Sequence, residues 1–326
     1  MKALFICENL LSVIRREERV QGHVHSVFNN ACNIETENEF ITLLCKEKEM
    51  APMSVIVNNG EGVNFKNLHI KQNSIFDFRV NGFYSKENNI FVNVDGAKSW
   101  FPGIILGSTN CLENILLENI RIMECGLGSQ GKLYGIAPLI SMLCYELPEL
   151  GLLPFQTYVE DKSYEFIKYR FLKFIQALAT YDTKGMDDIA ESIIGFGPGL
   201  TPAMDDFISG IMISFIHLGD YYKLSISKIY EFNRKLISKG LSKTTRVSAE
   251  MLKHSSIGET NQGVKNLMEE LFKSHNEEGI TKALLNLIGY GETSGTDTAF
   301  GVYVGSKIFT NIKYRRSWLN EYLLRY

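Results

Sequence analysis

Residues 195–210 read GFGPGLTPAMDDFISG, a stretch in which a glycine-rich turn leads directly into an apolar helix. Thr201 followed by Pro202 is a strong helix start, because the threonine oxygen accepts an early backbone N–H and proline fits the first turn. Asp205 and Asp206 then lie near the positive end of the helix dipole. The simplest interpretation is a capped, dipole-matched helix whose remaining surface is buried.

Three glycines alternate upstream of this helix, although a turn needs only one, and each glycine costs about 0.5–1 kcal/mol of backbone entropy. Gly195, Gly197 and Gly199 clear side chains from one backbone face. The amides up to Leu200 and Thr201 can then close around a phosphate or a carboxylate. The stretch is not a Walker loop, because no lysine follows, and its glycine spacing differs from a dinucleotide fingerprint. The residues alone leave an anion site and a structural loop equally open.

A second segment, GYGETSGTDTAFG at residues 289–301, repeats the order of glycines, small hydroxyl residues and an aspartate. In both segments a glycine follows the aspartate by four residues, with Gly210 after Asp206 and Gly301 after Asp297. Residues four apart share a helical face, so we expect the two helices to approach closely and to bring their acids together. The alternative is an ordinary capping box with a glycine packing contact.

A third segment, LSKTTRVSAEMLKHS, offers Thr244, Thr245 and Arg246 at another expected helix start. Arginine can hold a carboxylate or phosphate with two parallel hydrogen bonds, although a lone arginine in a first turn is most often simply solvated. Arg246 is therefore a candidate anion-binding residue only because the two glycine-rich motifs accompany it.

The composition is that of an ordinary globular protein, with 326 residues, 45% hydrophobic and 22% charged. The formal net charge of −3 gives no electrostatic reason to expect a nucleic acid or an anionic membrane as partner. The six cysteines lack C-x-x-C or metal-like spacing, which indicates reduced thiols. We find no signal-peptide pattern and no apolar run long enough to cross a bilayer, so we expect a cytoplasmic protein.

The pattern changes from strand-like to helical along the chain. Short strand-like segments separated by Asn and Gly run from about residue 20 to 145, and a Pro- and Gly-containing linker follows at 147–156. Apolar residues then recur at helical spacing from 164 to 178. Further helices are expected at 186–194, 202–218, 224–239, 245–254, 263–274, 278–289 and 297–309. The sequence predicts an α+β protein, with a mostly β domain at 1–150 and an α-helical domain at 151–326.

Taken together, GFGPGLTPAMDDFISG, TTRVSAEML and GETSGTDTAFG, in this order and spacing, resemble the AllH-type subunit family of oxamate carbamoyltransferase. Weaker similarity reaches back through HSVFNNACN and VDGAKSWFPG, so the resemblance covers most of the chain. Met204 departs from it, because the family commonly has a small residue there. The resemblance implies a subunit of a multisubunit enzyme of allantoin or purine nitrogen catabolism, which interconverts oxalurate and phosphate with oxamate and carbamoyl phosphate.

Carbamoyl transfer needs hydrogen-bond donors for the phosphate and for the carbonyl oxygen, and a base for a poorly nucleophilic amide nitrogen. The candidate catalytic residues are Asp206, Asp297 and Arg246. The candidate substrate-binding residues are Gly197, Gly199, Leu200, Thr201, Asp205, Thr245, Ser294, Gly295 and Thr296, with Thr298 as a further donor. The expected ligand is carbamoyl phosphate, oxamate or oxalurate, and the expected partners are the other subunits of the complex.

The acids conflict with an anionic ligand, because an aspartate about 4 Å from an anion is repelled by about 4 kcal/mol at an effective dielectric of about 20. Either a cation such as Mg²⁺, Arg246 or a lysine lies between them, or the acids face inward and hold the loop. We expect the inward arrangement for Asp205 and a cation between Asp206 and Asp297. Mg²⁺ is the one candidate cofactor, and the sequence assigns no residue as a metal ligand. A noncatalytic or regulatory subunit that binds an anionic metabolite and docks a catalytic chain is the competing function.

Overall fold

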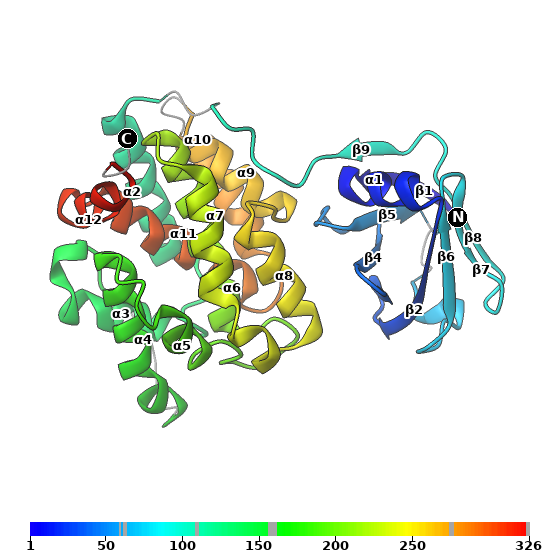
Figure 1. Ribbon diagram of the computed structural model, residues 1–326, viewed down its shortest axis with the longest axis horizontal. Coiled ribbons are helices and arrows are strands. Elements are labelled where there is room, and N and C mark those ends of the chain that lie inside the picture. Colours follow the sequence, from blue (N-terminus) through cyan, green and yellow to red (C-terminus); the bar gives the residue numbers. More distant parts are fainter. Residues whose placement is uncertain (59, 61–63, 108–110, 156–161, 274–276, 324–326) are drawn as a thin grey trace. The chain divides into compact units, whose positions relative to one another are not determined.

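The computed structural model describes residues 1–326 except 59, 61–63, 108–110, 156–161, 274–276 and 324–326. The chain forms two compact units (Figure 1). One comprises Met1–Pro102 and Thr260–Gln262, and the other comprises Gly103–Glu259 and Gly263–Tyr326. The first is built mainly from strands and the second from helices, which confirms the predicted α+β class.

The β unit is a sheet that closes on itself. In the described residues the strand order is β5-β4-β3-β2-β6-β7-β8-β1-β9, and β1 also pairs with β5. The first strand of the chain is antiparallel to β5 and parallel to β8 and β9, so it completes the closed sheet. The strands are β1 (Lys2–Cys7), β2 (Arg19–Val27), β3 (Ala31–Thr36), β4 (Phe40–Cys45), β5 (Ser54–Asn58), β6 (Ile75–Arg79), β7 (Gly82–Ser85), β8 (Ile90–Asn93) and β9 (Lys98–Trp100).

The β unit has its own hydrophobic core. The alternation of buried and exposed residues along β2 follows the period of two of a strand with one buried face. Phe78 lies at the centre of an aromatic cluster, with ring centroids 6.3 Å from Phe76 and 4.8 Å from Phe83. The helix α1 (Glu8–Glu17) adds its apolar face to this core.

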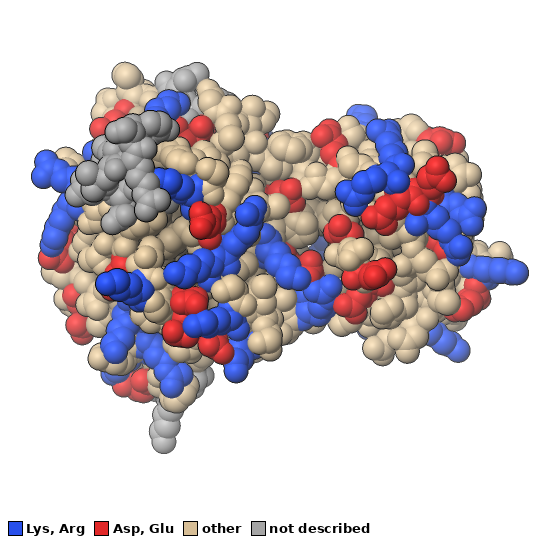
Figure 2. Space-filling model, in the orientation of Figure 1, with Lys and Arg blue, Asp and Glu red and all other residues tan. Residues whose placement is uncertain are grey.

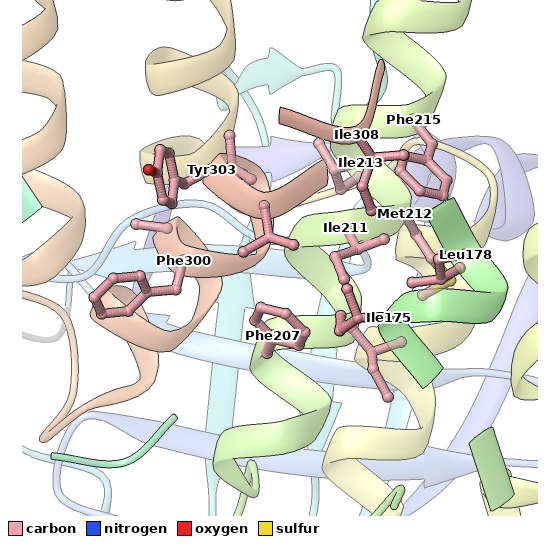
Figure 3. Close-up of a cluster of buried hydrophobic side chains, with 14 of the residues drawn as sticks. Ile175, Leu178, Phe207, Ile211, Met212, Ile213, Phe215, Phe300, Tyr303 and Ile308 are labelled. Carbon is pink, nitrogen blue, oxygen red and sulfur yellow. The ribbon is translucent and has the colours of Figure 1, made fainter. Parts of the chain in front are cut away.

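The helical unit is organised around α6 (Ala203–Tyr221) and α11 (Ser294–Thr310), which pack against each other and are buried along almost their whole length. Phe207 and Phe215 of α6, Ile308 of α11 and Leu178 point into one apolar cluster (Figure 3). The remaining helices are α2 (Glu113–Gln130), α3 (Ala137–Glu146), α4 (Lys162–Thr180), α5 (Met186–Glu191), α7 (Ile226–Ile237), α8 (Arg246–Ser256), α9 (Gln262–Leu271), α10 (Glu277–Ile288) and α12 (Ile312–Leu323).

Two glycines allow α6 and α11 to approach closely. A Cβ atom added to Gly210 would lie 3.0 Å from Gly301 Cα and 2.9 Å from Val302 N. A Cβ atom added to Gly301 would lie 3.0 Å from Gly210 Cα and would overlap the Phe207 carbonyl. The close approach predicted from the matching Asp–Gly spacing is therefore confirmed.

The change from strand to helix comes earlier than the sequence pattern indicated. The helices α2 and α3 lie at 113–146, within the range expected to be mostly β. Leu116, Ile120, Met123 and Leu127 of α2 are buried at helical spacing, but isoleucines and glycines lower its intrinsic helix propensity. Packing against α10 and α11 stabilises the helix instead. The segment 147–156, expected as a linker, contributes Leu150, Leu152 and Phe155 to the core of the helical unit.

Basic and acidic side chains are interspersed on the face shown in Figure 2, in keeping with the small net charge of −3. Within the described residues, no helix combines the length and the apolar character that crossing a membrane requires.

Candidate functional site

The turn before α6 has left-handed backbone at each of its three glycines, with φ of 85° at Gly195, 115° at Gly197 and 100° at Gly199. Side chains rarely tolerate this conformation. A Cβ atom at Gly195 would also overlap the Lys243 carbonyl, and one at Gly197 would lie 2.7 Å from Ala203 N. At Gly199 the space is open, so the backbone conformation alone requires glycine there. Each of the three glycines is therefore needed to form the turn.

Asp205 holds this turn from inside the protein. Its Oδ1 accepts the Gly195 N–H at 2.7 Å, and its Oδ2 accepts the hydroxyls of Ser248, at 2.6 Å, and of Thr244. Burial raises the pKa of Asp205, and these three donors act in the opposite direction. Both carboxylate oxygens are thus engaged by the protein, as the inward arrangement requires.

The start of α8 packs beneath the same turn. Thr245 caps the helix by accepting the Ser248 N–H at 3.1 Å, and its own hydroxyl donates to the Leu200 carbonyl. Arg246 is the first residue of α8 and pairs with Glu250 one turn later. Ser248 was not singled out from the sequence, because a serine inside a helical segment carries no signal for a distant carboxylate.

The two glycine-rich turns face each other. Thr201 Oγ1 and Ser294 Oγ are 3.0 Å apart in a hydrogen bond that joins the turn before α6 to the first residue of α11. Asp206 and Asp297 are close enough for the negative charge of Asp297 to raise the pKa of Asp206. The structure thus brings together all three motifs that the sequence singled out.

Asp206 is buried, with 2% of its surface exposed, and its Oδ2 has no hydrogen-bond partner among the described residues. Burial raises its pKa well above the ordinary value, and the charge of Asp297 raises it further. The hydroxyls of Ser294 and Thr201 act in the opposite direction. This environment favours the protonated carboxyl group.

Asp297 is completely buried. Its Oδ1 accepts the Ile136 N–H at 2.8 Å, whereas its Oδ2 has no hydrogen-bond partner in the described part of the chain. Burial raises the pKa of Asp297 to about 7, against the lowering effect of the Ile136 N–H and the Thr293 hydroxyl. In the ranges that the structure describes, no group of three or more His, Cys, Asp or Glu side chains could hold a metal ion.

The segment between α2 and α3 also contacts the second glycine-rich turn and the start of α11, which the sequence did not predict. Lys132 N–H donates to Thr296 Oγ1 at 3.3 Å, and Lys132 Nζ donates to the Gly291 carbonyl at 2.7 Å. Gly135 has φ of 72°, and a Cβ atom there would lie 2.6 Å from an Asp297 carboxylate oxygen. The available signal was the pair of glycines in GKLYG, which resembles any turn.

Several predicted substrate-binding groups are occupied by the protein itself. Gly295 N–H donates to the Tyr290 carbonyl at 3.1 Å, and Thr296 is completely buried. The hydroxyl of Thr298 donates to the Ser294 carbonyl at 2.8 Å. Gly295, Thr296 and Thr298 therefore lie in the packing behind the turn and not on its surface.

Other predicted donors keep their hydrogen-bonding capacity. Within the described residues, the N–H groups of Gly197, Gly199, Leu200 and Thr201 have no hydrogen-bond partner. Leu200 is 47% exposed, so this part of the turn is open to solvent. A hollow of about 400 Å³ elsewhere in the helical unit, lined by Glu124, Lys307 and others, contains none of these residues. The free donors lie on an exposed turn and not in that hollow.

A protein-family model described as "Oxamate carbamoyltransferase subunit AllH" matches residues 193–306, which contain both glycine-rich turns and all of α8. A second model, described as "AllH family N-terminal domain", matches residues 2–99 and thus the β unit. The chain belongs to the AllH family. The end of the AllH N-terminal match at residue 99 lies close to the division between the units at Pro102. Neither the curated proteins nor the solved structures contain a match to this AllH chain.

Proposed function

We propose that this AllH chain is a subunit of an oxamate carbamoyltransferase of purine or allantoin nitrogen catabolism, and that it binds an anionic substrate at its two facing glycine-rich turns. The enzyme interconverts oxalurate and phosphate with oxamate and carbamoyl phosphate. The observation that carries the proposal is the Thr201–Ser294 hydrogen bond, which joins the two turns beside a set of unpartnered amides. The family description supports the reaction.

The unpartnered N–H groups of 197–201 bind the phosphate or carboxylate group of the substrate in this proposal. Amide donors at a helix N-terminus suit an anion because they combine hydrogen bonds with the positive end of the helix dipole. Thr245 supports them by holding the Leu200 carbonyl. Arg246, the first residue of α8, supplies the countercharge in this proposal, because a guanidinium can hold a phosphate or a carboxylate with parallel hydrogen bonds.

Asp206 and Asp297 serve as the acid–base pair of the proposed site. An ionised carboxylate about 4 Å from the anion would repel it by about 4 kcal/mol at an effective dielectric of about 20. Their raised pKa values reduce this conflict, because a protonated carboxyl group carries no charge. Gly295 and Thr296 contribute by packing the start of α11 in place.

A noncatalytic role is the second candidate function. It is favoured by the burial of both acids, whose unpartnered oxygens are sealed from solvent. In that case the turns bind an anionic metabolite, and the chain docks a separate catalytic subunit.

Activity measurements with the isolated chain and with the complete complex separate the two functions. If the chain catalyses, Asp206→Asn and Arg246→Ala in the complex should each lower carbamoyl transfer, whereas Asp188→Asn, a surface control on α5, should not. If activity needs the partners and survives both substitutions, the noncatalytic role is correct.

Ligand binding has its own test. Phosphate, carbamoyl phosphate or oxamate should raise the thermal stability of the isolated chain, because a ligand of the native state stabilises it. Gly199→Ala should remove this gain in thermal stability, because alanine disfavours the φ of 100° found at Gly199. The added Cβ atom would clash with no neighbouring atom, so only the backbone of the turn is disturbed. An unchanged melting temperature with all three ligands would indicate that the turn has only a structural role.

A further inference from the structure

Asp206 and Asp297 are two buried acids without a cationic partner. Neither forms an ion pair with a Lys, Arg or His side chain in the described part of the chain. Each keeps one carboxylate oxygen, Oδ2, that is sealed from solvent and has no hydrogen-bond partner among the described residues. Burying an uncompensated carboxylate costs several kcal/mol, so positive charge must accompany the pair.

The kind of positive charge follows from the space and the ligands. Mg²⁺ demands near-octahedral oxygen coordination and usually retains several waters. Two sealed carboxylate oxygens are too few ligands, and they are out of reach of water. A proton needs neither a cavity nor further ligands. It also provides the donor that an unpartnered carboxylate oxygen lacks.

We infer that Asp206 and Asp297 share one proton at neutral pH and exchange it with the reacting substrate through the hydroxyl groups of Thr201 and Ser294. This inference rests on the proposed function. It assigns the two acids as positioning residues that act through the hydroxyls, because they do not themselves reach the surface of the turn.

The hydroxyls are suitably placed for such a relay. Thr201 and Ser294 are both partly exposed and are hydrogen-bonded to each other at 3.0 Å. Each hydroxyl can donate one hydrogen bond and accept others, so it can take a proton on one side and release one on the other. Hydrogen bonds from both hydroxyls lower the pKa of Asp206, which places them at its carboxylate.

The charged and polar groups around the two acids either add negative charge or have partners of their own, so a proton remains as the compensating charge. On α6, Asp205 adds a further negative charge that raises the pKa of Asp206. From α8, Arg246 pairs with Glu250, and from the segment before α3, Lys132 Nζ bonds the Gly291 carbonyl. From α4, Tyr164 donates its hydroxyl to the Gly135 carbonyl.

The proton completes the chemistry of the proposed reaction. In the direction of oxalurate cleavage, an oxygen of hydrogen phosphate forms a bond to the urea carbonyl carbon, and the bond from that carbon to the oxamate nitrogen breaks. The departing nitrogen takes the proton of the pair through the hydroxyl relay. The proton of hydrogen phosphate then returns to the pair. The products are oxamate and the carbamoyl phosphate dianion, and the carboxyl groups end with the proton count with which they began.

The proton can be observed without turnover. Infrared spectra of the isolated chain at pH 7 should show the C=O band of a protonated carboxyl group, and this band should shift or lose intensity in Asp206→Asn and in Asp297→Asn but stay unchanged in Asp188→Asn. Carboxyl ¹³C spectra of aspartate-labelled wild-type protein provide the same information if a variant fails to fold. Two ionised carboxylates at pH 7 would overturn the inference, as would Mg²⁺ binding that Asp206→Asn abolishes.

The relay is tested in the complete complex. Ser294→Ala should lower kcat by about 100-fold, a typical contribution of acid–base catalysis, and Ser294→Thr should restore it. Asp297→Asn should change the pH dependence of kcat near neutrality, which a merely structural role would leave in place. An unaltered pH profile and kcat in these variants would overturn the relay. A complex without any carbamoyl transfer would overturn the proposed function, while the spectroscopic test of the shared proton would still stand.

Discussion

Asp205 and Asp206 are adjacent in sequence, but their carboxylates differ in hydrogen bonding. The carboxylate of Asp205 accepts one backbone amide and two hydroxyls, whereas Asp206 keeps an oxygen without a partner. Successive residues of a helix point in directions about 100° apart, so adjacent acids can meet different surroundings. The first holds the turn through its hydrogen bonds, and the second keeps a buried oxygen without a partner among the described residues.

Asp205→Ala should destabilise the helical unit by about 3 kcal/mol, because buried donors left without an acceptor cost about 1–3 kcal/mol each and partial relaxation offsets some of that cost. Asp205→Asn, which keeps a carbonyl acceptor, should cost less. Urea unfolding monitored by circular dichroism measures both. Equal stability of wild type and Asp205→Ala would mean that the turn does not depend on this carboxylate.

Asp297 should make stability depend on pH. Its pKa is about 7 in the folded protein against an ordinary value of 3.8, so between these values the native state binds more protons than the unfolded chain. The free energy of unfolding therefore falls as pH rises through this window, by at most about 4 kcal/mol. In Asp297→Asn this fall should be smaller. Unfolding at pH 5 and pH 8 gives the comparison, and identical pH dependence in the two proteins would contradict the raised pKa.

At the scale of elements, the close contact between α6 and α11 depends on two glycines. Gly210→Ala and Gly301→Ala should each cost about 3 kcal/mol or more, because overpacking forces the backbones apart. Gly128→Ala on the exposed face of α2 is the matched control, since its added Cβ atom would lie 3.4 Å from the Phe155 ring. The control should be neutral or gain up to about 1 kcal/mol. Similar melting temperatures for all three variants would rule out the tight contact.

The elements that the sequence predicted share a strong local pattern. Helices such as α7, α9 and α10 place their apolar residues on one face, and the ranges expected for the helices from α5 to α11 agree with the observed ones to within about three residues at each end. β1 and α1 were not predicted, because KALFIC and ENLLSV form one apolar patch without a turn residue between them. β3, with three polar residues in ACNIET, shows little strand pattern of its own and is held by pairing with β2 and β4.

The site was predictable where its residues carry a local signal. Alternating glycines and repeated Asp–Gly spacing mark the two turns, and the structure places them together. The contacts of Ser248, Lys132 and Ile136 were not predicted, because they join segments far apart in the chain. The burial of Thr296 behind the turn likewise depends on tertiary packing and leaves no trace in local sequence.

At the scale of the molecule, the two units have separate hydrophobic cores. We expect two calorimetric transitions, because each unit can lose its own core independently. Phe78→Ala should lower only the transition of the β unit, and Phe174→Ala only that of the helical unit, each by about 3–5 kcal/mol. A single transition that both variants shift equally would show that the units unfold together.

The pairing of β1 with β5, β8 and β9 has a consequence for biosynthesis. Translation reaches β1 before its partners β5, β8 and β9, so β1 has unpaired edges until the residues up to Trp100 have been synthesised. Exposed strand edges invite pairing with other chains. Translation speed and chaperone supply during the synthesis of this segment should therefore influence the soluble yield of the protein.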